Sequence, residues 1–151
     1  MVEVRRLVPG DLAGFRVMNA LFSDVFEEPE NYVDHPPGEA NVLDWLANTT
    51  NIGVLGLVDG EPRGAIAAYI LQKFEQQRSE VFIYDLAVLE SHRRIGLATA
   101  MIEEVRRIAR EASAWTVFVQ ADVFPEDEPA RALYRSLAQS EITALHFDIE
   151  P

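Results

Sequence analysis

The stretch Asp85-Leu-Ala-Val-Leu-Glu-Ser-His-Arg-Arg-Ile-Gly-Leu-Ala-Thr-Ala100 joins a buried strand to a helix, and it decides how the rest of the chain is interpreted. Val81 to Val88 is a nearly unbroken apolar run, which predicts a buried strand. From Gly96 to Arg110 apolar residues recur at three- and four-residue spacing, which predicts an amphipathic helix. Between the two lies the pattern Arg93-x-x-Gly96-x-Ala98.

The start of this predicted helix has the properties of an anion site. Unpaired N–H groups and the helix dipole attract negative charge without any special side chain. The small residues Gly96 and Ala98 would let a pyrophosphate approach the backbone closely, and Arg93 and Arg94 add positive charge beside it. Neither the Walker pattern nor the dinucleotide-binding fingerprint is present. The alternative interpretation is a tight strand-to-helix turn with solvated arginines.

The remaining segments alternate between strand and helix patterns. Asp11 is predicted to cap the first helix, Asp59-Gly60 to form a hairpin turn, and the proline- and acid-rich segment Glu27 to Glu39 to be an exposed loop. The predicted strands are Val2–Val8, Ile52–Val58, Gly64–Leu71, Val81–Val88, Val117–Ala121 and Ile142–Ile149. The predicted helices are Leu12–Val25, Ala40–Ala47, Gly96–Arg110 and Pro129–Ala138. This order predicts an α/β fold, a mixed sheet with helices on both faces, in a single domain over residues 1–151.

Composition narrows the function classes. The formal net charge is −12, from 25 acidic and 13 basic residues, which repels nucleic acid and favours a cationic partner. The simpler interpretation of that charge is a soluble acidic cytoplasmic protein. The absence of cysteine excludes disulfides and thiolate metal sites, and the three histidines lack metal-ligand spacing, so we expect no metal. No signal peptide or membrane-spanning run is evident, so we expect a cytoplasmic location and no membrane partner.

The pattern Arg93-x-x-Gly96-x-Ala98 resembles the coenzyme A-binding motif of the GNAT N-acyltransferase superfamily, and the predicted element order fits that fold over essentially the whole chain. Further runs look like the aminoglycoside 3-N-acetyltransferases of the GNAT type. These runs are Lys73-Phe-Glu-Gln76, Arg78-Ser-Glu80, Tyr84-Asp-Leu-Ala-Val88, His92-Arg-Arg94, Val119-Gln-Ala-Asp122 and His146-Phe-Asp-Ile149. The resemblance implies an acetyl-coenzyme A-dependent enzyme that acetylates an aminoglycoside, at the 3-amine, and confers resistance. It also implies a homodimer.

Residues for the cosubstrate follow from the same resemblance. The strand before the cradle would pair with the pantetheine chain, and the N–H groups around Arg94 to Thr99 would hold the pyrophosphate. The predicted coenzyme A contacts are Leu86, Ala87, Val88, Arg93, Arg94, Ile95, Gly96, Leu97, Ala98 and Thr99.

Acetyl transfer to an amine needs a neutral amine, a stabilised tetrahedral oxyanion and a proton for the departing thiolate. Tyr134, in Asp127-x-x-Ala130-x-x-Leu133-Tyr134, resembles the GNAT tyrosine that faces the thioester sulfur; the alternative is a core tyrosine. Asp85 interrupts an apolar strand, where an unpaired charge is expensive to bury. It therefore either meets a buried partner or faces the incoming amine as its base. The predicted substrate-binding acids are Glu80, Asp122, Glu75 and Asp148, which are otherwise surface residues.

Two other functions remain open at this stage. A GNAT enzyme acting on a polyamine or a protein amine would use the same cosubstrate chemistry. A non-catalytic coenzyme A-binding module would keep the cradle alone, and the pairing of Asp85 with Tyr134 in one sequence argues against it.

Overall fold

The computed structural model describes residues 1–151, which form two compact units, Met1–Gln120 and Ala121–Pro151. The single domain over residues 1–151 stays a prediction. No helix combines the length and the apolar character needed to cross a membrane.

Most of the predicted helices and strands are present, in the predicted order. The strands are β1 Val2–Arg6, β2 Asn51–Val58, β3 Glu61–Gln72, β4 Ser79–Val88 and β5 Ala114–Val119. The helices are α1 Leu12–Phe26, α2 Pro29–Tyr32, α3 Glu39–Ala47, α4 Leu97–Glu111 and α5 Glu128–Leu137. Two 3₁₀ helices, η1 Glu90–His92 and η2 Pro125–Asp127, complete the list. Everything up to β5 belongs to the first unit, while η2 and α5 belong to the second.

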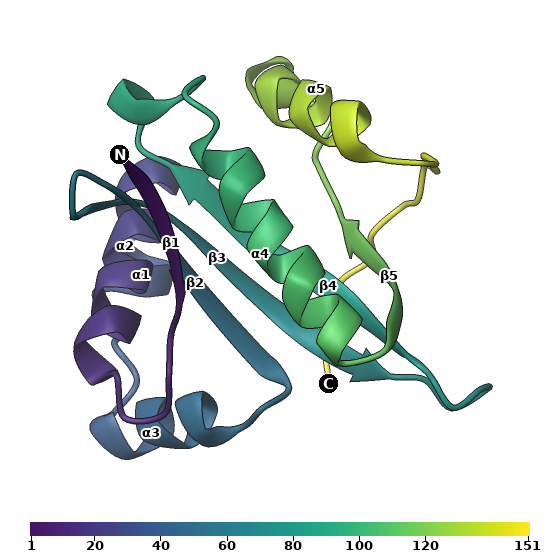
Figure 1. The fold of residues 1–151 in the computed structure, drawn as a ribbon. Helices are drawn as coiled ribbons and strands as arrows, with labels where there is room; N and C mark the ends of the chain where they lie inside the picture. The colour runs from purple at the N-terminus through teal and green to yellow at the C-terminus, as the bar shows by residue number, and fades with distance from the viewer. The chain divides into compact units, whose positions relative to one another are not determined.

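The first unit is built around one five-stranded sheet in the order β1-β2-β3-β4-β5. The first three pairs are antiparallel, whereas β4 and β5 run parallel and are joined through α4. In Figure 1, α4 crosses the near face of the sheet, and α1 lies behind it. The predicted mixed α/β sheet with helices on both faces is therefore confirmed.

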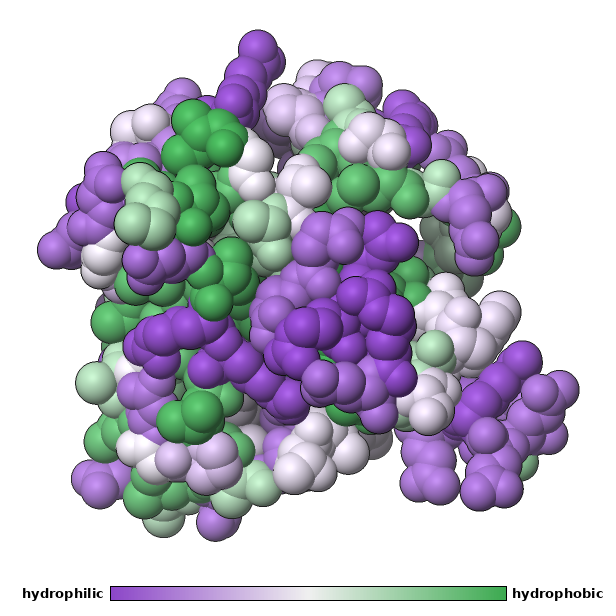
Figure 2. Space-filling model, viewed as in Figure 1, coloured by the Kyte–Doolittle hydropathy of each residue, from purple (hydrophilic) through white to green (hydrophobic).

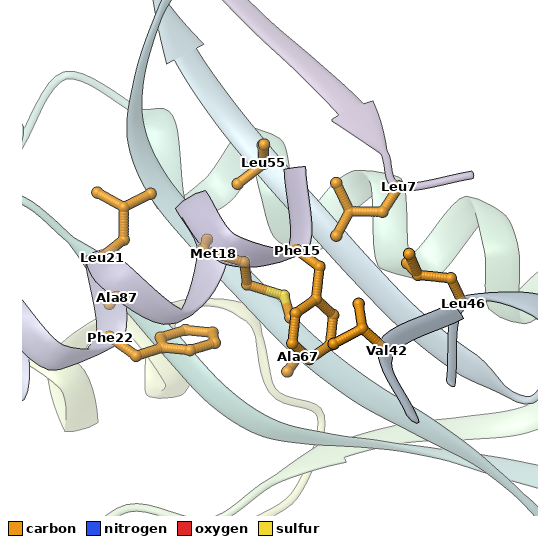
Figure 3. Close-up of a cluster of buried hydrophobic side chains, with 11 residues drawn as sticks. Leu7, Phe15, Met18, Leu21, Phe22, Val42, Leu46, Leu55, Ala67 and Ala87 are labelled. Carbon is orange, nitrogen blue, oxygen red and sulfur yellow. The ribbon is translucent and has the colours of Figure 1, made fainter. Parts of the chain in front are cut away.

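Each of the helices α1 and α4 packs on the sheet through one apolar stripe. Figure 3 shows Phe15, Met18 and Phe22 of α1 directed at the sheet, where they join Leu55 and Ala67. The predicted cap is confirmed, because Asp11 Oδ1 accepts a hydrogen bond from the Gly14 N–H at 2.9 Å and so satisfies a donor that the helix start leaves unpaired.

The other face of the sheet is covered by α4. Its apolar stripe includes Leu97, Met101 and Val105, all with at most 1% exposure. Figure 2 shows hydrophilic side chains gathered over the outward side of this helix. Arg107 of this helix forms ion pairs with Glu104 and Glu111. The helix is therefore amphipathic, as its spacing predicts.

Two predicted segments differ from the structure. The strand predicted over Ile142–Ile149 is wrong, because residues 138–151 carry no regular secondary structure and Ile142 is 90% exposed. A strand needs a neighbour for its backbone groups, and the unit Ala121–Pro151 contains no other strand. The predicted loop over Glu27–Glu39 instead contains α2, which begins at Pro29, where a fixed φ suits the first helical position.

Candidate active site

A β-bulge in β4 aims Asp85 at the face of the sheet that α1 covers. Asp85 lies opposite Ala67, but Ile83 lies opposite Ala68, so Tyr84 is an extra residue between the two pairs. Side chains alternate between the two faces of a strand, so Ile83 and Asp85 would normally share a face. The extra residue between them places Asp85 on the face opposite to that of Ile83. Asp85 thus shares the face of Ala67 and Ala87, which belong to the core cluster beneath α1.

Asp85 has a specific partner on this face. The phenol of Tyr32, in α2, donates a hydrogen bond to Asp85 Oδ2 at 2.8 Å. Burial raises the pKa of the Asp85 carboxyl, the Tyr32 hydrogen bond opposes that rise, and the negative charge of Glu28 adds to it. The pKa of Tyr32 is also raised, first by burial and then by Asp85, so the phenol remains a donor throughout the physiological range. The sequence left open whether Asp85 has a buried partner, and Tyr32 is that partner.

Packing holds Tyr32 in place. Its ring centroid lies 5.6 Å from that of Phe22 and 6.0 Å from that of Phe26, both on α1. Arg16 Nη2 donates to the carbonyl of Pro37 at 2.8 Å, which ties the segment after α2 to α1. Tyr32 also lines a surface pocket of about 340 Å³ together with Arg16, Asn19, Val33 and Pro36. Tyr32 therefore contacts Asp85 and also borders a pocket.

Aromatic side chains continue the same region of β4. The rings of Phe82 and Phe118 stack at 4.7 Å between centroids, and Tyr84 lies 5.5 Å from Phe82. Tyr84 is 63% exposed. Aromatic faces attract cations and pack against the C–H groups of rings. A ring-shaped ammonium compound would thus find both an acid and an apolar surface here.

The junction after β4, where the cradle is predicted, leaves the start of α4 open to an anion. Arg94 and Gly96 both have left-handed backbone conformations, with φ of 63° and 85°, and α4 starts directly after Gly96 without a side-chain cap. The first N–H groups of a helix have no intrahelical acceptor, which leaves those of Leu97, Ala98 and Thr99 available to an anion. A Cβ added at Gly96 would meet no atom within 4 Å, so the space in front of this backbone is open.

Two other residues of the predicted cradle make contacts within the protein that limit how they could meet a ligand. Arg93 Nε donates to the Val88 carbonyl at 3.2 Å, so this guanidinium also fastens the end of β4. The side chain of Leu97 is buried, so only its backbone can meet a ligand, whereas Arg94 is exposed and Ile95 is 50% exposed.

The edge of β4 beside the cradle is free of a neighbouring strand. β5 pairs with β4 only from Ser79 to Ile83, while β4 continues to Val88. The unpaired part contains the predicted pantetheine contacts Leu86, Ala87 and Val88. An extended chain with amide groups can pair with such an edge as an additional strand does.

Two of the predicted substrate-binding acids meet at one lysine. Lys73 Nζ lies 3.0 Å from Glu80 Oε1 and 3.5 Å from Glu75 Oε1, near the turn between β3 and β4. Their charge is partly offset by this contact and by Arg78, which lies 3.9 Å from Glu75. Asp85 is thus the predicted acid of the first unit without a cation beside it.

The second unit holds the other three predicted residues. Tyr134 lies on α5 with its side chain partly buried. Asp122 is exposed, and its carbonyl accepts a hydrogen bond from Arg131 Nη1. Asp148 is exposed and lies 2.9 Å from His146 Nε2. No group of acids and histidines is arranged to hold a metal ion.

Tyr32 is the residue of this site that sequence reasoning missed. It falls in the segment predicted as an exposed loop, 53 positions from Asp85. The one available signal was the charge of Asp85 within an apolar strand, which required a partner without indicating which residue supplies it.

Comparison with known proteins identifies the fold and the family. The sequence profile described as "Acetyltransferase (GNAT) family" matches residues 17–138. The solved structure of an aminoglycoside acetyltransferase from an uncultured soil metagenomic sample is 42% identical, with a TM-score of 0.96 over 100% of this chain and 99% of that one. Another from such a sample, solved in complex with sisomicin, is 26% identical, with a TM-score of 0.89 over 99% of this chain and 96% of that one.

A curated enzyme matches over a shorter region. The L-2,4-diaminobutyric acid acetyltransferase of Shouchella clausii (strain KSM-K16) is 36% identical over 80 residues, which are 53% of this chain and 42% of that protein. The match thus spans less than half the length of this relative. Together the comparisons confirm the resemblance that the sequence motifs indicate.

Proposed function

We propose that this chain, which belongs to the GNAT family of acetyltransferases, transfers an acetyl group from acetyl-coenzyme A to an amine of an aminoglycoside antibiotic. The observation that carries this proposal is the end-to-end similarity, at 42% identity, to an aminoglycoside acetyltransferase. The net charge of −12 is consistent with a polycationic substrate. Acetylation would convert one ammonium group of the drug to a neutral amide, which is how we expect the enzyme to confer resistance.

The cosubstrate fits the residues of the cradle. The open space before Gly96 and the first N–H groups of α4 suit a pyrophosphate, and the unpaired edge of β4 suits a pantetheine chain. Acetyl-coenzyme A would supply the acyl group as a thioester. Arg94, which is exposed beside the cradle, would add a positive charge near the phosphates.

The chain's own residues supply the proton transfers. Asp85 would accept a proton from the substrate ammonium, directly or through water, and so release the amine lone pair. The amine nitrogen then forms a bond to the thioester carbonyl carbon and loses its second proton to water, and the carbon–sulfur bond breaks from the tetrahedral intermediate. Tyr134 would donate its phenol proton to the departing thiolate. Glu80, Glu75, Asp122 and Asp148 would contribute to binding the cation.

The 3-amine is the position we propose for acetylation. This assignment rests on the motif runs shared with the 3-N-acetyltransferases of the GNAT type. A small diamine such as 2,4-diaminobutyrate is the second candidate substrate, favoured by the 80-residue match to the acetyltransferase that carries its name. That match leaves about half of this chain unaccounted for, so the antibiotic ranks first.

We also propose that the enzyme acts as a homodimer in the cytoplasm, without a membrane or nucleic-acid partner. The support for dimerisation is the segment of residues 142–149, where Leu145, Phe147 and Ile149 are 80%, 75% and 88% exposed. Exposed apolar side chains that gather on one surface are typical of interaction sites. Light scattering during size-exclusion chromatography tests this, and a monomeric mass at micromolar concentration contradicts it.

Parallel acetyl-coenzyme A turnover assays separate the candidate substrates. We expect thiol release with gentamicin or sisomicin at a kcat/KM at least about 100-fold above that with 2,4-diaminobutyrate, spermidine or a lysine peptide. A preference for one of the other amines would transfer the proposal to that substrate. Binding of coenzyme A without turnover of any amine would leave a non-catalytic module.

A further inference from the structure

We propose that Tyr32 is a positioning residue for Asp85, which it holds in the orientation that accepts a proton from the substrate amine. This inference rests on the proposed function, because it assumes that Asp85 is the base. The observation behind it is the 2.8 Å hydrogen bond from the Tyr32 phenol to Asp85 Oδ2.

The hydrogen bond gives the two carboxylate oxygens of Asp85 different roles. Tyr32 occupies Oδ2, which assigns Oδ1 to the substrate. The Asp85 side chain would otherwise rotate about its own bonds, because its neighbour across the sheet, Ala67, is too small to confine it. The rings of Phe22 and Phe26, both on α1, pack against Tyr32 and restrict its movement. The orientation of Asp85 therefore depends on the packing of α1.

The bond also acts on ionisation. Burial alone raises the pKa of Asp85, and the charge of Glu28 raises it further, whereas the hydrogen bond from Tyr32 lowers it. On this face of the sheet, Ala67 of β3 lies opposite Asp85, and it belongs to the same apolar cluster as Phe22 of α1. β5 does not extend alongside Asp85. Tyr32 is thus the hydrogen-bond donor that opposes the rise in the pKa of Asp85.

Tyr32 also lies where a bound substrate could contact it. Tyr32 lines the pocket of about 340 Å³ that Arg16 and Asn19 also border. A substrate group that enters this pocket therefore touches the same side chain that orients the base. Occupation of the pocket and orientation of Asp85 are coupled through one residue.

The test compares Tyr32→Phe with Tyr69→Phe. Tyr32→Phe keeps the ring contacts and removes the donor, so we expect kcat to fall about tenfold, because a hydrogen bond to a charged group is lost. We expect the acid limb of the kcat/KM profile to move up by about one pH unit, with the KM for acetyl-coenzyme A unchanged. Tyr69→Phe keeps its edge contact with Trp45 and should leave both quantities unchanged. A lower rate without any movement of the acid limb would reduce Tyr32 to a packing residue.

A double-mutant cycle separates this inference from the proposed function. If Tyr32 acts only through Asp85, then Tyr32→Phe causes no further loss when added to Asp85→Asn. A further tenfold loss in that background would overturn the positioning role. Full activity of Asp85→Asn would overturn the base assignment and the positioning role with it. An inactive Asp85→Asn combined with an unchanged Tyr32→Phe would overturn the positioning role alone. Thermal melts of each variant establish that the comparison is between folded proteins.

Discussion

Gly96→Ala separates the conformational role of this glycine from its role in the cradle. Gly96 has φ of 85°, and an added Cβ would meet no atom within 4 Å. The substitution therefore creates no clash inside the protein and costs only the left-handed conformation, about 1–2 kcal/mol for an L-residue. In a chain of 151 residues, about 1 kcal/mol corresponds to roughly 2–4 °C, so the Tm should fall by about 2–8 °C.

The effect on coenzyme A should be larger than the effect on stability implies. The new methyl group occupies the open space in which we place the pyrophosphate, so we expect the affinity to fall at least about tenfold, or about 1.4 kcal/mol. Gly96→Asn, which tolerates a left-handed backbone, should lose less stability and just as much affinity. Gly96→Glu adds negative charge and should abolish binding.

Gly60→Ala is the matched control. Gly60, in the turn between β2 and β3, has φ of 82° and equally open surroundings, so it carries the same strain without the cradle. We expect its Tm to fall like that of Gly96→Ala while coenzyme A affinity stays unchanged. Isothermal titration calorimetry and thermal melts give both numbers. Wild-type coenzyme A affinity in Gly96→Ala, or an equal loss in Gly60→Ala, would refute the cradle.

The remaining predictions concern the proton transfers. Tyr134→Phe should lower kcat with little change in coenzyme A affinity, and an unchanged rate of the chemical step would leave Tyr134 as a packing residue. Asp85→Asn should lower kcat by about 10²–10⁴-fold, whereas Asp122→Asn should mainly raise the KM for the antibiotic; steady-state kinetics that gave the reverse pattern would exchange the two roles. The pKa of Asp85 is raised in the folded protein, so its negative charge lowers the stability of the fold at pH values above the ordinary aspartate pKa. Asp85→Asn should therefore have a Tm at pH 7 that is equal to or above that of the wild type. At pH 3, where the carboxyl is protonated, any such gain in Tm should disappear. A marked fall in Tm at pH 7 would show that the carboxylate is a structural partner.

Local patterns predict the parts of this fold that depend on local physics. The stripe of Leu97, Met101 and Val105 is buried as its spacing indicates, and Asp11 caps the helix that follows it. The segment 142–149 shows where that reasoning fails. Alternation describes a strand only when a neighbour satisfies its backbone, and sequence does not reveal whether one is present.

The site depends more on long-range contacts. The strand-to-helix junction at Gly96 is visible in the sequence because such a junction is built from consecutive residues. The bulge at Tyr84 has no such signature, since no glycine or proline marks it, yet it decides which face Asp85 occupies. The Tyr32–Asp85 bond joins residues 53 positions apart, and only the packing of α2 brings them together.

Nuclear magnetic resonance of the reaction product tests the central claim most directly. Incubation of the protein with acetyl-coenzyme A and gentamicin should yield a single acetylated species, with the new amide on the 3-amine of the antibiotic. Recovery of unmodified gentamicin, under conditions in which another amine in the same mixture is acetylated, would contradict the assignment of an aminoglycoside as the substrate.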